Sequence, residues 1–507
     1  MLFRSVADLV AALAEDEQCR AIACLFEGAT SAARMLEAGE RARRAGKPVV
    51  MLKLGVSDDG AAAARSHTGS LAGSAAAWRA LFERAGFIPV EDYEALLEYA
   101  RFFASAGKPQ ARDVAVISGS GGAGVMAADK AAKHGVPMPQ PLQATGEALR
   151  GIVPEFGAAR NPCDPTGQVL SKPESFGQCC RALLADSQYG ALVIPGTVAV
   201  AETASVRVPE IAALVRAQPK PVVMVWLSEW LQGPGSSGYE GDERVPLFRS
   251  MDRCFGAIAA WHALADRSGG FSGKRRSPEL AVQAARSVLS SAGEVVAERG
   301  AKKILAAYGV PVVQDRLAAT ADEAAAAARA LGYPVAMKAE SPTILHRTEL
   351  GAVRLGIADE ATVRRTFEEI AAAARGHQLD GVLVQPMIAG IEVIVGARVD
   401  PTVGPLVVVG TGGVLVELMQ DSVAALAPVS RAEADAMLRR LKGYQLLAGF
   451  RGAAAVHLEA LADAVVRISE FAADFSTEIE ELDVNPLLCS PARVLAVDAL
   501  ITKRRKG

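Results

Sequence analysis

The chain has 507 residues, half of them hydrophobic and 22% charged, and its 54 basic and 57 acidic side chains leave a formal charge of −3. This composition excludes a disordered chain and gives no indication of a nucleic-acid or membrane partner, and no apolar stretch approaches the roughly 18–20 residues of a membrane span. At about 150 residues per domain the length predicts about three domains, and seven scattered cysteines without zinc spacing indicate reduced thiols in a cytoplasmic protein.

The first block of the chain has the pattern of a βαβ unit. Residues 21–28 and 48–55 are short apolar runs typical of strands, and residues 31–46 between them have helical spacing. A further helix is predicted over residues 93–105. The stretch 105–112, which follows this helix, is the predicted domain boundary.

A second block alternates strands and helices in the same way. Its predicted strands are residues 113–118, 191–196 and 221–227. This alternation is typical of α/β layers with parallel sheets. Residues 266–278 are rich in Gly and Ser and are basic, so they form the clearest linker.

The last third of the chain changes character. The predicted strands are residues 333–339, 381–387, 391–399, 404–410 and 493–501. Valine alternates with polar residues along several of them, which indicates a more antiparallel, half-exposed sheet.

The segment SHTGSLAGS (66–74) contains His67, which precedes a helix predicted from Leu71 with Thr68 or Ser70 as its cap. The N-terminus of a helix favours an anion such as phosphate, so it would stabilise a phosphoryl group carried by a histidine at this position. The alternative is a polar cap residue without chemistry.

The loop GSGGAG (119–124) lies between a predicted strand and a predicted helix and fits G-x-G-x-x-G. Dinucleotide binding is disfavoured because residues 136–146, where that motif needs an acid, contain neither Asp nor Glu. A phosphate-cradling loop and tight helix–strand packing remain as alternatives. The glycines are Gly119, Gly121, Gly122 and Gly124.

The turn-forming cluster NPCDPTG (161–167) contains Asn161 and Asp164. Their side chains could contact a ligand or form an Asx-turn, and the residues do not separate these alternatives.

The last third carries polar residues that form a set. Lys338 ends a predicted strand, where its ammonium could hold a nucleotide phosphate, and His346 follows in a loop. Residues 385–392 are predicted to be a strand, a short connector and a second strand that bears Glu392. Taken one at a time, these residues also have interpretations without ligand binding; Lys338, for example, could be a charge at a strand end.

Asp483 and Asn485 lie two residues apart on a predicted strand, so they share one face. Asp498 could come alongside from a neighbouring strand. Carboxylate and amide oxygens are ligands that magnesium prefers when it also holds phosphates. Together with Lys338, these residues predict a magnesium–nucleotide site, although Asp483 alone could be a solvated edge residue.

With these motifs in place, the chain resembles the nucleoside-diphosphate-forming acyl-CoA synthetase superfamily, to which ADP-forming acetate–CoA ligase and succinyl-CoA synthetase belong. The resemblance covers essentially residues 5–502 and implies an α/β chain with two flavodoxin-like parallel-sheet domains, 1–108 and 109–270, followed by an α+β ATP-grasp domain, 277–507. The motifs are LFEG (25–28), SHTGSLAGS, SGSGGAG, NPCDPTG, KAESPTILHRTELGAVRLG (338–356), VLVQPMIAGIEVIVG (382–396) and ELDVNPL (481–487).

The resemblance implies that a carboxylic acid, CoA and ATP give acyl-CoA, ADP and phosphate through a phosphohistidine. His67 matches the phosphorylated histidine, Glu27 the carboxylate that orients it, and His346 a further histidine that relays phosphate. The glycine loop matches a second helix N-terminus that faces the phosphate.

For the ATP-grasp domain, the resemblance implies a nucleotide site with ATP and Mg²⁺ as cofactors. The implied nucleotide-binding residues are Lys338 at the phosphates, Gln385 and Met387 at the adenine hinge, and Glu392. The implied magnesium ligands are Asn485 and Asp498, with Asp483 where relatives carry Glu or Asp.

Members of this superfamily normally open with a CoA-binding domain, and this chain begins where that domain should end. A separate CoA-binding subunit, a truncated start or lost CoA chemistry would each account for this. The rival functions are a nucleotide-binding or regulatory subunit and an ATP-grasp carboxylate–amine ligase. We expect an oligomer that takes a small carboxylic acid, CoA and a nucleotide.

Overall fold

The computed structural model describes residues 5–28, 31–56, 74–166, 172, 174–197, 201–266, 277–344, 347–413 and 421–505. The chain divides into two compact units. Unit 1 comprises residues 1–72 and 85–270, and unit 2 comprises residues 73–84 and 271–507. Among the described residues, no helix combines the length and the apolar character that crossing a membrane requires.

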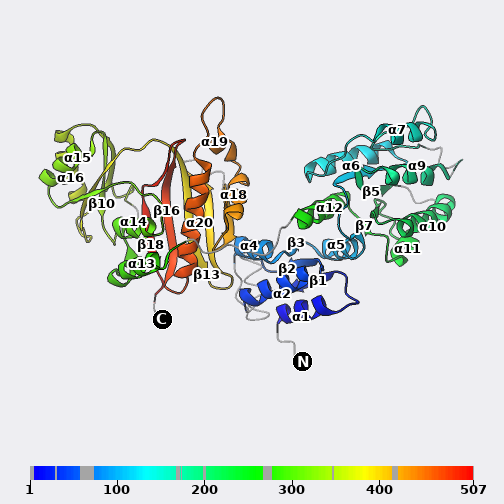
Figure 1. The fold of residues 1–507 in the computed structure, drawn as a ribbon, viewed down its shortest axis with the longest axis horizontal. Helices are drawn as coiled ribbons and strands as arrows, with labels where there is room; N and C mark the ends of the chain where they lie inside the picture. Colours follow the sequence, from blue (N-terminus) through cyan, green and yellow to red (C-terminus); the bar gives the residue numbers. More distant parts are fainter. Residues whose placement is uncertain are drawn as a thin grey trace. The chain divides into compact units, whose positions relative to one another are not determined.

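The first sheet of unit 1 is parallel, with the strand order β1-β2-β3 (Figure 1). Its strands are β1 (Ile22–Phe26), β2 (Val49–Lys53) and β3 (Ile88–Val90), and its helices are α1 (Val6–Glu15), α2 (Ala32–Arg44) and α5 (Tyr93–Ala106). Ser5, Ser31 and Asp92 cap these helices by accepting a backbone hydrogen bond, which fixes where each helix begins. The predicted βαβ unit is confirmed.

The second sheet of unit 1 is also parallel, in the order β4-β5-β6-β7, as predicted. Its strands are β4 (Asp113–Val116), β5 (Tyr189–Gly196), β6 (Val222–Trp226) and β7 (Leu247–Phe248). The helices of this part are α6 (Gly121–Lys133), α7 (Gln143–Arg150), α9 (Glu174–Ala185), α10 (Ala201–Ala217), α11 (Ser236–Gly241) and α12 (Met251–Asp266). The strands are buried almost throughout, as is typical of parallel strands with helices on both faces.

Side chains alternate between the two faces of this second sheet. One face packs into a core that it shares with the first sheet, for example through Val193 and Val50. The other face packs under α9 and α10. Its core includes Ile194, Met224, Trp226, Phe176 and Ile211.

Unit 2 contains a smaller antiparallel sheet with the order β11-β10-β12-β9. Its strands are β9 (Arg316–Ala318), β10 (Val335–Glu340), β11 (Val353–Ile357) and β12 (Gly381–Pro386). Helices α15 (Ala321–Leu331) and α16 (Glu360–Ala373) lie side by side against it (Figure 1).

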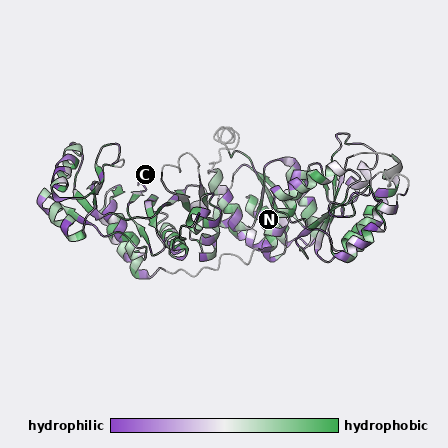
Figure 2. Ribbon diagram, turned by 90° about the horizontal axis from the view of Figure 1, so that it is seen from above, coloured by the Kyte–Doolittle hydropathy of each residue, from purple (hydrophilic) through white to green (hydrophobic). Residues whose placement is uncertain are grey.

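The larger sheet of unit 2 is antiparallel, with the order β15-β14-β13-β16-β18-β8, and β17 also pairs with β16. Its strands are β8 (Val295–Val296), β13 (Ile391–Asp400), β14 (Gly404–Thr411), β15 (Ser422–Leu426), β16 (Ile479–Cys489), β17 (Val494–Ala496) and β18 (Ala499–Lys503). The helices are α13 (Glu279–Ser291), α14 (Glu298–Ala307), α18 (Arg431–Arg439), α19 (Tyr444–Ala448) and α20 (Leu458–Asp474). The helices carry hydrophilic and hydrophobic residues side by side in Figure 2, as helices that cover a core should. The predicted antiparallel character of this region is confirmed.

The strand predicted over residues 493–501 is interrupted, so β17 ends at Ala496 and β18 begins at Ala499. Pro486 of β16 lies opposite the interruption, where its carbonyl accepts a hydrogen bond from the Val497 N–H at 3.0 Å. Proline has no N–H to return to the ladder, so pairing breaks locally. Asp498 therefore lies between two strands rather than within one.

Helix α4 (Ala75–Ala85) follows the His67 segment in sequence, and most of it belongs to unit 2. Within that unit, the Arg84 guanidinium donates to the carbonyl of Leu426 at 2.7 Å and pairs with Glu433 at 2.9 Å. Ser74 Oγ accepts from the Ala77 N–H at 3.2 Å and so caps the described part of the helix. The predicted caps Thr68 and Ser70 and the predicted start at Leu71 lie outside the described residues.

Candidate functional site

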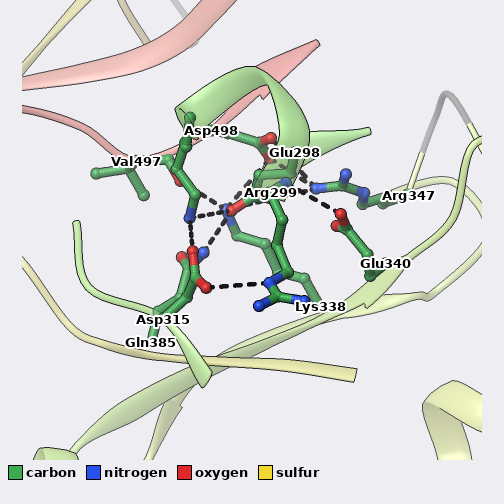
Figure 3. Close-up of polar contacts among 10 residues, drawn as sticks. Glu298, Arg299, Asp315, Lys338, Glu340, Arg347, Gln385, Val497 and Asp498 are labelled. Atoms are coloured by element: carbon green, nitrogen blue, oxygen red, sulfur yellow. Dashed lines mark hydrogen bonds and ion pairs between the residues drawn. The ribbon is translucent and has the colours of Figure 1, made fainter. Parts of the chain in front are cut away.

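Unit 2 contains a buried set of ion pairs between α14, β10, the segment after β10 and the turn before β18 (Figure 3). We call it the charged cluster. Its members are Glu298, Lys302, Lys338, Arg347 and Asp498.

Lys338 is the member of the charged cluster that the sequence predicted at a strand end. It lies within β10, two residues before the strand ends, and its side chain is buried. Its Nζ is 3.2 Å from Asp498 Oδ2 and 3.5 Å from Glu298 Oε2, and it donates to the Val497 carbonyl at 3.4 Å. The ammonium is therefore held in place by anionic oxygens on two sides.

Glu298 is the centre of the charged cluster, and the motif analysis did not find it. It is the first residue of α14, is fully buried, and pairs with Lys302 at 2.9 Å and Arg347 at 2.5 Å. Burial alone would raise the pKa of Glu298, but Lys338, Lys302 and Arg347 together hold it below its ordinary value. The sequence carries one indication, because Glu298 and Lys302 share the helix face of the buried residue Leu305.

Arg347 joins the charged cluster from the segment that follows His346. Its guanidinium is 3.1 Å from Asp498 Oδ2 and is almost completely buried. Burial raises the pKa of Asp498, and Glu298 adds to this, although Lys338 and Arg347 oppose it. Arg347 was not predicted, and His346 lies outside the described residues.

Two buried acceptor atoms next to the charged cluster have no hydrogen-bond partner within the described part of the chain. They are Gln385 Oε1 on β12 and Glu340 Oε2 at the end of β10. Gln385 Nε2 donates to Glu298, and Glu340 Oε1 accepts from the Arg299 N–H at 3.0 Å. Leaving such atoms unpaired is costly, so they suit a ligand that supplies donors.

Met387, the other predicted hinge residue, lies just after β12 and is 39% exposed. Its N–H donates to the Pro334 carbonyl at 3.1 Å, which holds the connector between β12 and β13 against the start of β10. Gln385 pairs with Ala336 of β10, so the predicted hinge lies beside the strand that carries Lys338.

Two of the predicted magnesium ligands, Asp483 and Asn485, lie at the middle of β16, whereas the carboxylate of Asp498, before β18, pairs with Lys338 and Arg347. Asp483 and Asn485 lie on the face opposite the buried Leu482 and Val484, as predicted, and the Asn485 N–H donates to the Asp498 carbonyl at 3.1 Å. Burial raises the pKa of Asp483 to about 6, with help from Glu481 and Asp498. Crowded carboxylates beside an amide oxygen fit a hard divalent cation, which would relieve their repulsion.

Glu392 lies on β13, where it pairs with Leu488 of β16 and is exposed. Gly396, four residues further along β13, pairs with Asp483. Because side chains alternate along a strand, Glu392 and Asp483 lie on the same face of the sheet. Glu392 is therefore on the face of the predicted ligands but several residues away from them.

Replacing Asp483 with asparagine is expected to stabilise the chain in the absence of nucleotide and divalent cation. The folded pKa of about 6 lies above the unfolded value of about 3.9, so ionised Asp483 destabilises the fold at neutral pH. We expect a gain of about 1–2 kcal/mol, seen as a rise of a few degrees in Tm in thermal scans at about pH 7.5. The gain should shrink as the pH falls from about 6 towards about 4, where the carboxyl becomes protonated.

Glu480→Gln is the matched control, because Glu480 is an exposed neighbour on the same strand. It should leave Tm unchanged. An equal gain in Glu480→Gln, or a gain in Asp483→Asn that persists undiminished at about pH 4, would contradict the assignment.

In unit 1, polar side chains lie at the carboxyl edge of the first sheet. Glu27 directly follows β1. Lys53 is the last residue of β2, and it pairs in register with Phe26, the last residue of β1. Burial lowers the pKa of Lys53, although Glu27 opposes this, so the two charges lie near each other. Lys53 was not predicted. The carboxyl edge of a parallel sheet is where ligands bind in such folds, and His67 lies outside the described residues.

The predicted glycine loop is partly helical, because α6 begins at Gly121 and Ser120 caps it through a hydrogen bond from the Ala123 N–H at 3.4 Å. A Cβ on Gly124 would lie 3.1 Å from Pro162 Cβ, which supports the packing alternative for that glycine. A Cβ on Gly122 would meet nothing closer than 3.9 Å. The start of α6 therefore presents free backbone N–H groups at an open position.

The NPCDPTG cluster has a structural role at both of its candidate residues. Asn161 is buried, and its side chain bonds to the Val116 N–H and the Val114 carbonyl, both at 2.9 Å. Asp164 Oδ1 accepts from the Thr166 N–H at 2.8 Å, which is an Asx-turn. The Asx-turn alternative is therefore the one that the structure shows for Asp164, whereas Asn161 makes neither an Asx-turn nor a local bond but ties its segment to β4.

Three protein-family models match the chain. They are a succinyl-CoA ligase like flavodoxin domain over residues 3–103, a ligase-CoA domain over residues 114–227 and an ATP-grasp domain over residues 287–502. The charged cluster and the predicted magnesium ligands all fall within the last of these ranges.

Three curated relatives are similar to this chain. Acetate–CoA ligase (ADP-forming) I of Archaeoglobus fulgidus is 32% identical over 97% of this chain and 71% of its own length. A trans-feruloyl-CoA synthase from an unknown prokaryotic organism is 33% identical over 99% of this chain and 71% of its own length. The beta subunit of acetate–CoA ligase (ADP-forming) I of Pyrococcus furiosus is 40% identical over 40% of this chain and 89% of its own length.

Proposed function

Because the chain belongs to the family of ADP-forming acyl-CoA ligases, we propose that it couples ATP to thioester formation from a carboxylic acid and CoA through a phosphohistidine at His67. The observation that carries this function is the similarity to an ADP-forming acetate–CoA ligase over nearly the whole chain. The reaction forms a carbon–sulfur bond and releases ADP and phosphate.

Three domains are proposed to carry out this reaction: residues 1–108, 109–270 and 277–507. An oligomer or a separate CoA-binding subunit belongs to the same proposal, and the existence of a relative that is a separate beta subunit supports it. All seven cysteines lie in the described part of the chain and are free thiols, which supports a cytoplasmic location.

In this proposal the charged cluster binds the nucleotide phosphates. Lys338 and Arg347 are buried cations that pair with Asp498. A phosphate that bound both cations would replace Asp498 as their partner, because Arg and Lys donors bind phosphate oxygens well. Asp498 would then be free to turn towards Asp483 and Asn485.

The adenine would lie at the connector after β12. Gln385 Oε1, a buried acceptor with no hydrogen-bond partner among the described residues, suits the exocyclic amine of adenine, and Met387 would contribute apolar surface. Asp483, Asn485 and Asp498 would hold Mg²⁺, which when bound neutralises phosphate charge. Glu392 faces the same side of the sheet.

The chemistry at His67 follows from the need to carry a phosphoryl group between sites. The neutral imidazole nitrogen of His346 attacks the γ-phosphorus of ATP, and the bond to the ADP oxygen breaks as a nitrogen–phosphorus bond forms. A neutral ring nitrogen of His67 then takes the phosphoryl group as the bond between phosphorus and His346 breaks. Glu27 holds the His67 ring in the reactive tautomer, and His346 in this way relays phosphate from the nucleotide site to His67. The acid then takes the phosphoryl group from His67 to give an acyl phosphate, from which the CoA thiolate displaces phosphate.

The test of the proposed function is the identity of the nucleotide product. The full chain, with Mg²⁺, ATP, CoA and an acid, should give ADP and phosphate in amounts equal to the thioester, either alone or once a separate CoA-binding subunit is added. AMP and pyrophosphate as products, or ADP formation that needs an amine instead of CoA, would refute it. The second outcome would indicate the carboxylate–amine ligase alternative.

Gly122→Asp is expected to slow phosphoryl transfer to and from His67 by at least about tenfold, while Gly122→Ala should leave the rate nearly unchanged. Both side chains fit, because a Cβ at this position meets only Ser120 Oγ at 3.9 Å. The aspartate would compete with phosphate for the N–H groups at the start of α6. Rapid-quench labelling with γ-³²P ATP measures the rates, and equal rates for the two variants would contradict a phosphate-binding role.

A further inference from the structure

The side-chain amide of Gln385 is held in one orientation by Glu298 (Figure 3). Glu298 is the first residue of α14 and is fully buried, and Gln385 lies on β12, 87 residues further along the chain. The cations of the charged cluster hold the pKa of Glu298 below its ordinary value, so its carboxylate is ionised and only accepts hydrogen bonds. The amide of Gln385 must therefore turn its nitrogen towards Glu298.

This orientation leaves the amide oxygen of Gln385 for another partner. Gln385 Oε1 is buried and has no hydrogen-bond partner within the described part of the chain, and the residue as a whole is 1% exposed. The amide cannot turn over to change this, because its oxygen would then face the oxygen of Glu298. The side chain is thus fixed as an acceptor that lacks a donor.

Gln385 faces the same side of the smaller sheet as Lys338, which binds a phosphate in the proposed function. Gln385 is opposite Ala336 of β10, and Lys338 lies two residues further along that strand. Since side chains alternate along a strand, both side chains lie on one face as diagonal neighbours. Such neighbours are about 7–8 Å apart, a separation that a single nucleotide bridges.

Met387 gives a base a surface beside Gln385. Its N–H donates to the Pro334 carbonyl at 3.1 Å, which continues the pairing of β12 with β10 by one residue beyond Pro386. The chain is therefore still extended at this point, and Met387 lies on the same side as Gln385. Because Met387 is 39% exposed, a flat base packed on it approaches Gln385 from solvent.

The two common purine nucleotides differ in the group that would meet the oxygen of Gln385. Adenine carries an amine, a donor, at carbon 6, whereas guanine carries an oxygen, an acceptor, at the same position. The fixed oxygen of Gln385 pairs with the amine, but it would face a second acceptor in guanine. Because Gln385 is buried, water does not compensate for the wrong partner, which makes a mismatch costly.

We propose that Glu298 is a positioning residue that makes the site select ATP over GTP. By holding the nitrogen of the Gln385 amide, it leaves the amide oxygen to accept from the amine of adenine. This inference rests on the proposed function, which places the base at Gln385, and it adds which nucleotide the ligase takes and which residue decides the choice. Glu298 acts through Gln385 and does not itself touch the base.

The test is calorimetric titration of the full chain with ATP, GTP and inosine triphosphate, each with Mg²⁺. ATP should bind about 10- to 100-fold more tightly than GTP. Inosine triphosphate has the 6-oxygen without the 2-amino group of guanine, so it should bind as weakly as GTP. Gln385→Met should weaken ATP binding about tenfold and leave GTP binding nearly unchanged. Gln378→Met, at an exposed glutamine before β12, is the matched control and should keep the preference for ATP.

Glu298→Gln tests the positioning role itself. Lys302 keeps its pair with Asp315 at 2.6 Å, so the nitrogen of the new amide can take the end that faces Gln385 while its oxygen stays with the remaining cations. Gln385 would then turn its oxygen to that nitrogen and its own nitrogen to the base. The preference for ATP over GTP should fall at least tenfold. A merely structural role would weaken both nucleotides alike, and Glu294→Gln, an exposed matched control, should change neither.

Three results would each overturn the inference. They are equal affinities of the unaltered chain for ATP and GTP, a preference for ATP that Gln385→Met leaves unchanged, and a preference that a folded Glu298→Gln leaves unchanged. Gln385→Met removes no charge, so it decides the question even where Glu298→Gln does not fold.

Thioester formation separates the two proposals. A chain that selects ATP through Gln385 but forms no thioester, even with a CoA-binding subunit added, would support this inference and refute the proposed function. A chain that forms the thioester as readily with GTP as with ATP, and binds both equally well, would refute this inference alone.

Discussion

Replacing His67 with alanine should abolish the acid-labile label that the chain takes from γ-³²P ATP, and it should reduce thioester formation by about 10⁴-fold or more. The expected loss of thioester formation is this large because His67 is the covalent carrier of the phosphoryl group. Without it, a phosphoryl group bound at the nucleotide site has no route to the acid. The labelled chain, separated from free nucleotide and tested for acid and base stability, gives the measurement.

His377→Ala is the matched control, because His377 is an exposed histidine away from the proposed motifs. It should take the same label as the unaltered chain. Equal label in His67→Ala would refute the phosphohistidine, and thioester formation that survives His67→Ala would favour an acyl phosphate made directly from ATP.

His346→Ala tests the relay separately from the carrier. It should lose labelling from ATP while His67 still accepts phosphate in the reverse direction, from acyl-CoA and labelled phosphate. A full label from ATP in His346→Ala would remove the relay role and leave the role of His67 intact.

Most of the fold was predictable because its signals are local. The parallel strands β2 and β6 are continuous apolar runs, and β16 alternates buried and exposed residues, so each pattern identifies its own kind of sheet. The interruption between β17 and β18 was not predictable from residues 493–501 themselves. Its cause is Pro486, which lies on the partner strand.

The sequence predicted those site residues that their own position beside a strand identifies. It missed those that are identified only by contacts between segments far apart in the sequence. Lys338 and Asp498 each stand out beside a strand, but they are 160 residues apart in sequence. Glu298 occupies the apolar face of an amphipathic helix, where a charge is rarely buried without a partner. Its partners Lys338 and Arg347 come from β10 and from the segment that follows it, so only the folded chain reveals the pairing.

The same reasoning explains why Lys53 was missed. Lys53 ends a strand whose apolar pattern predicts nothing beyond burial, and its relation to Glu27 depends on the register between β1 and β2.

Lys338→Met should raise the Kd for ATP by about 100-fold, and it should do so by removing a phosphate partner rather than by unfolding unit 2. The methionine keeps the apolar stem that β10 buries. Glu298 retains Lys302 and Arg347, so its carboxylate is not left unpaired. The loss of stability should therefore lie below the 3–5 kcal/mol that is about the cost of breaking a buried pair completely.

Calorimetric titration with ATP and Mg²⁺, together with a thermal scan of each variant, measures the two effects separately. Lys303→Met is the matched control, because Lys303 is the exposed neighbour of Lys302 on α14, and it should change neither Kd nor Tm. Unchanged ATP binding in Lys338→Met would show that the charged cluster serves the fold alone. Weaker ATP binding with Tm nearly preserved would show instead that these buried cations bind an anionic ligand. A buried ion pair contributes little net stability when an apolar residue of similar size can replace one partner. Stability alone would therefore not explain why Lys338 is a lysine.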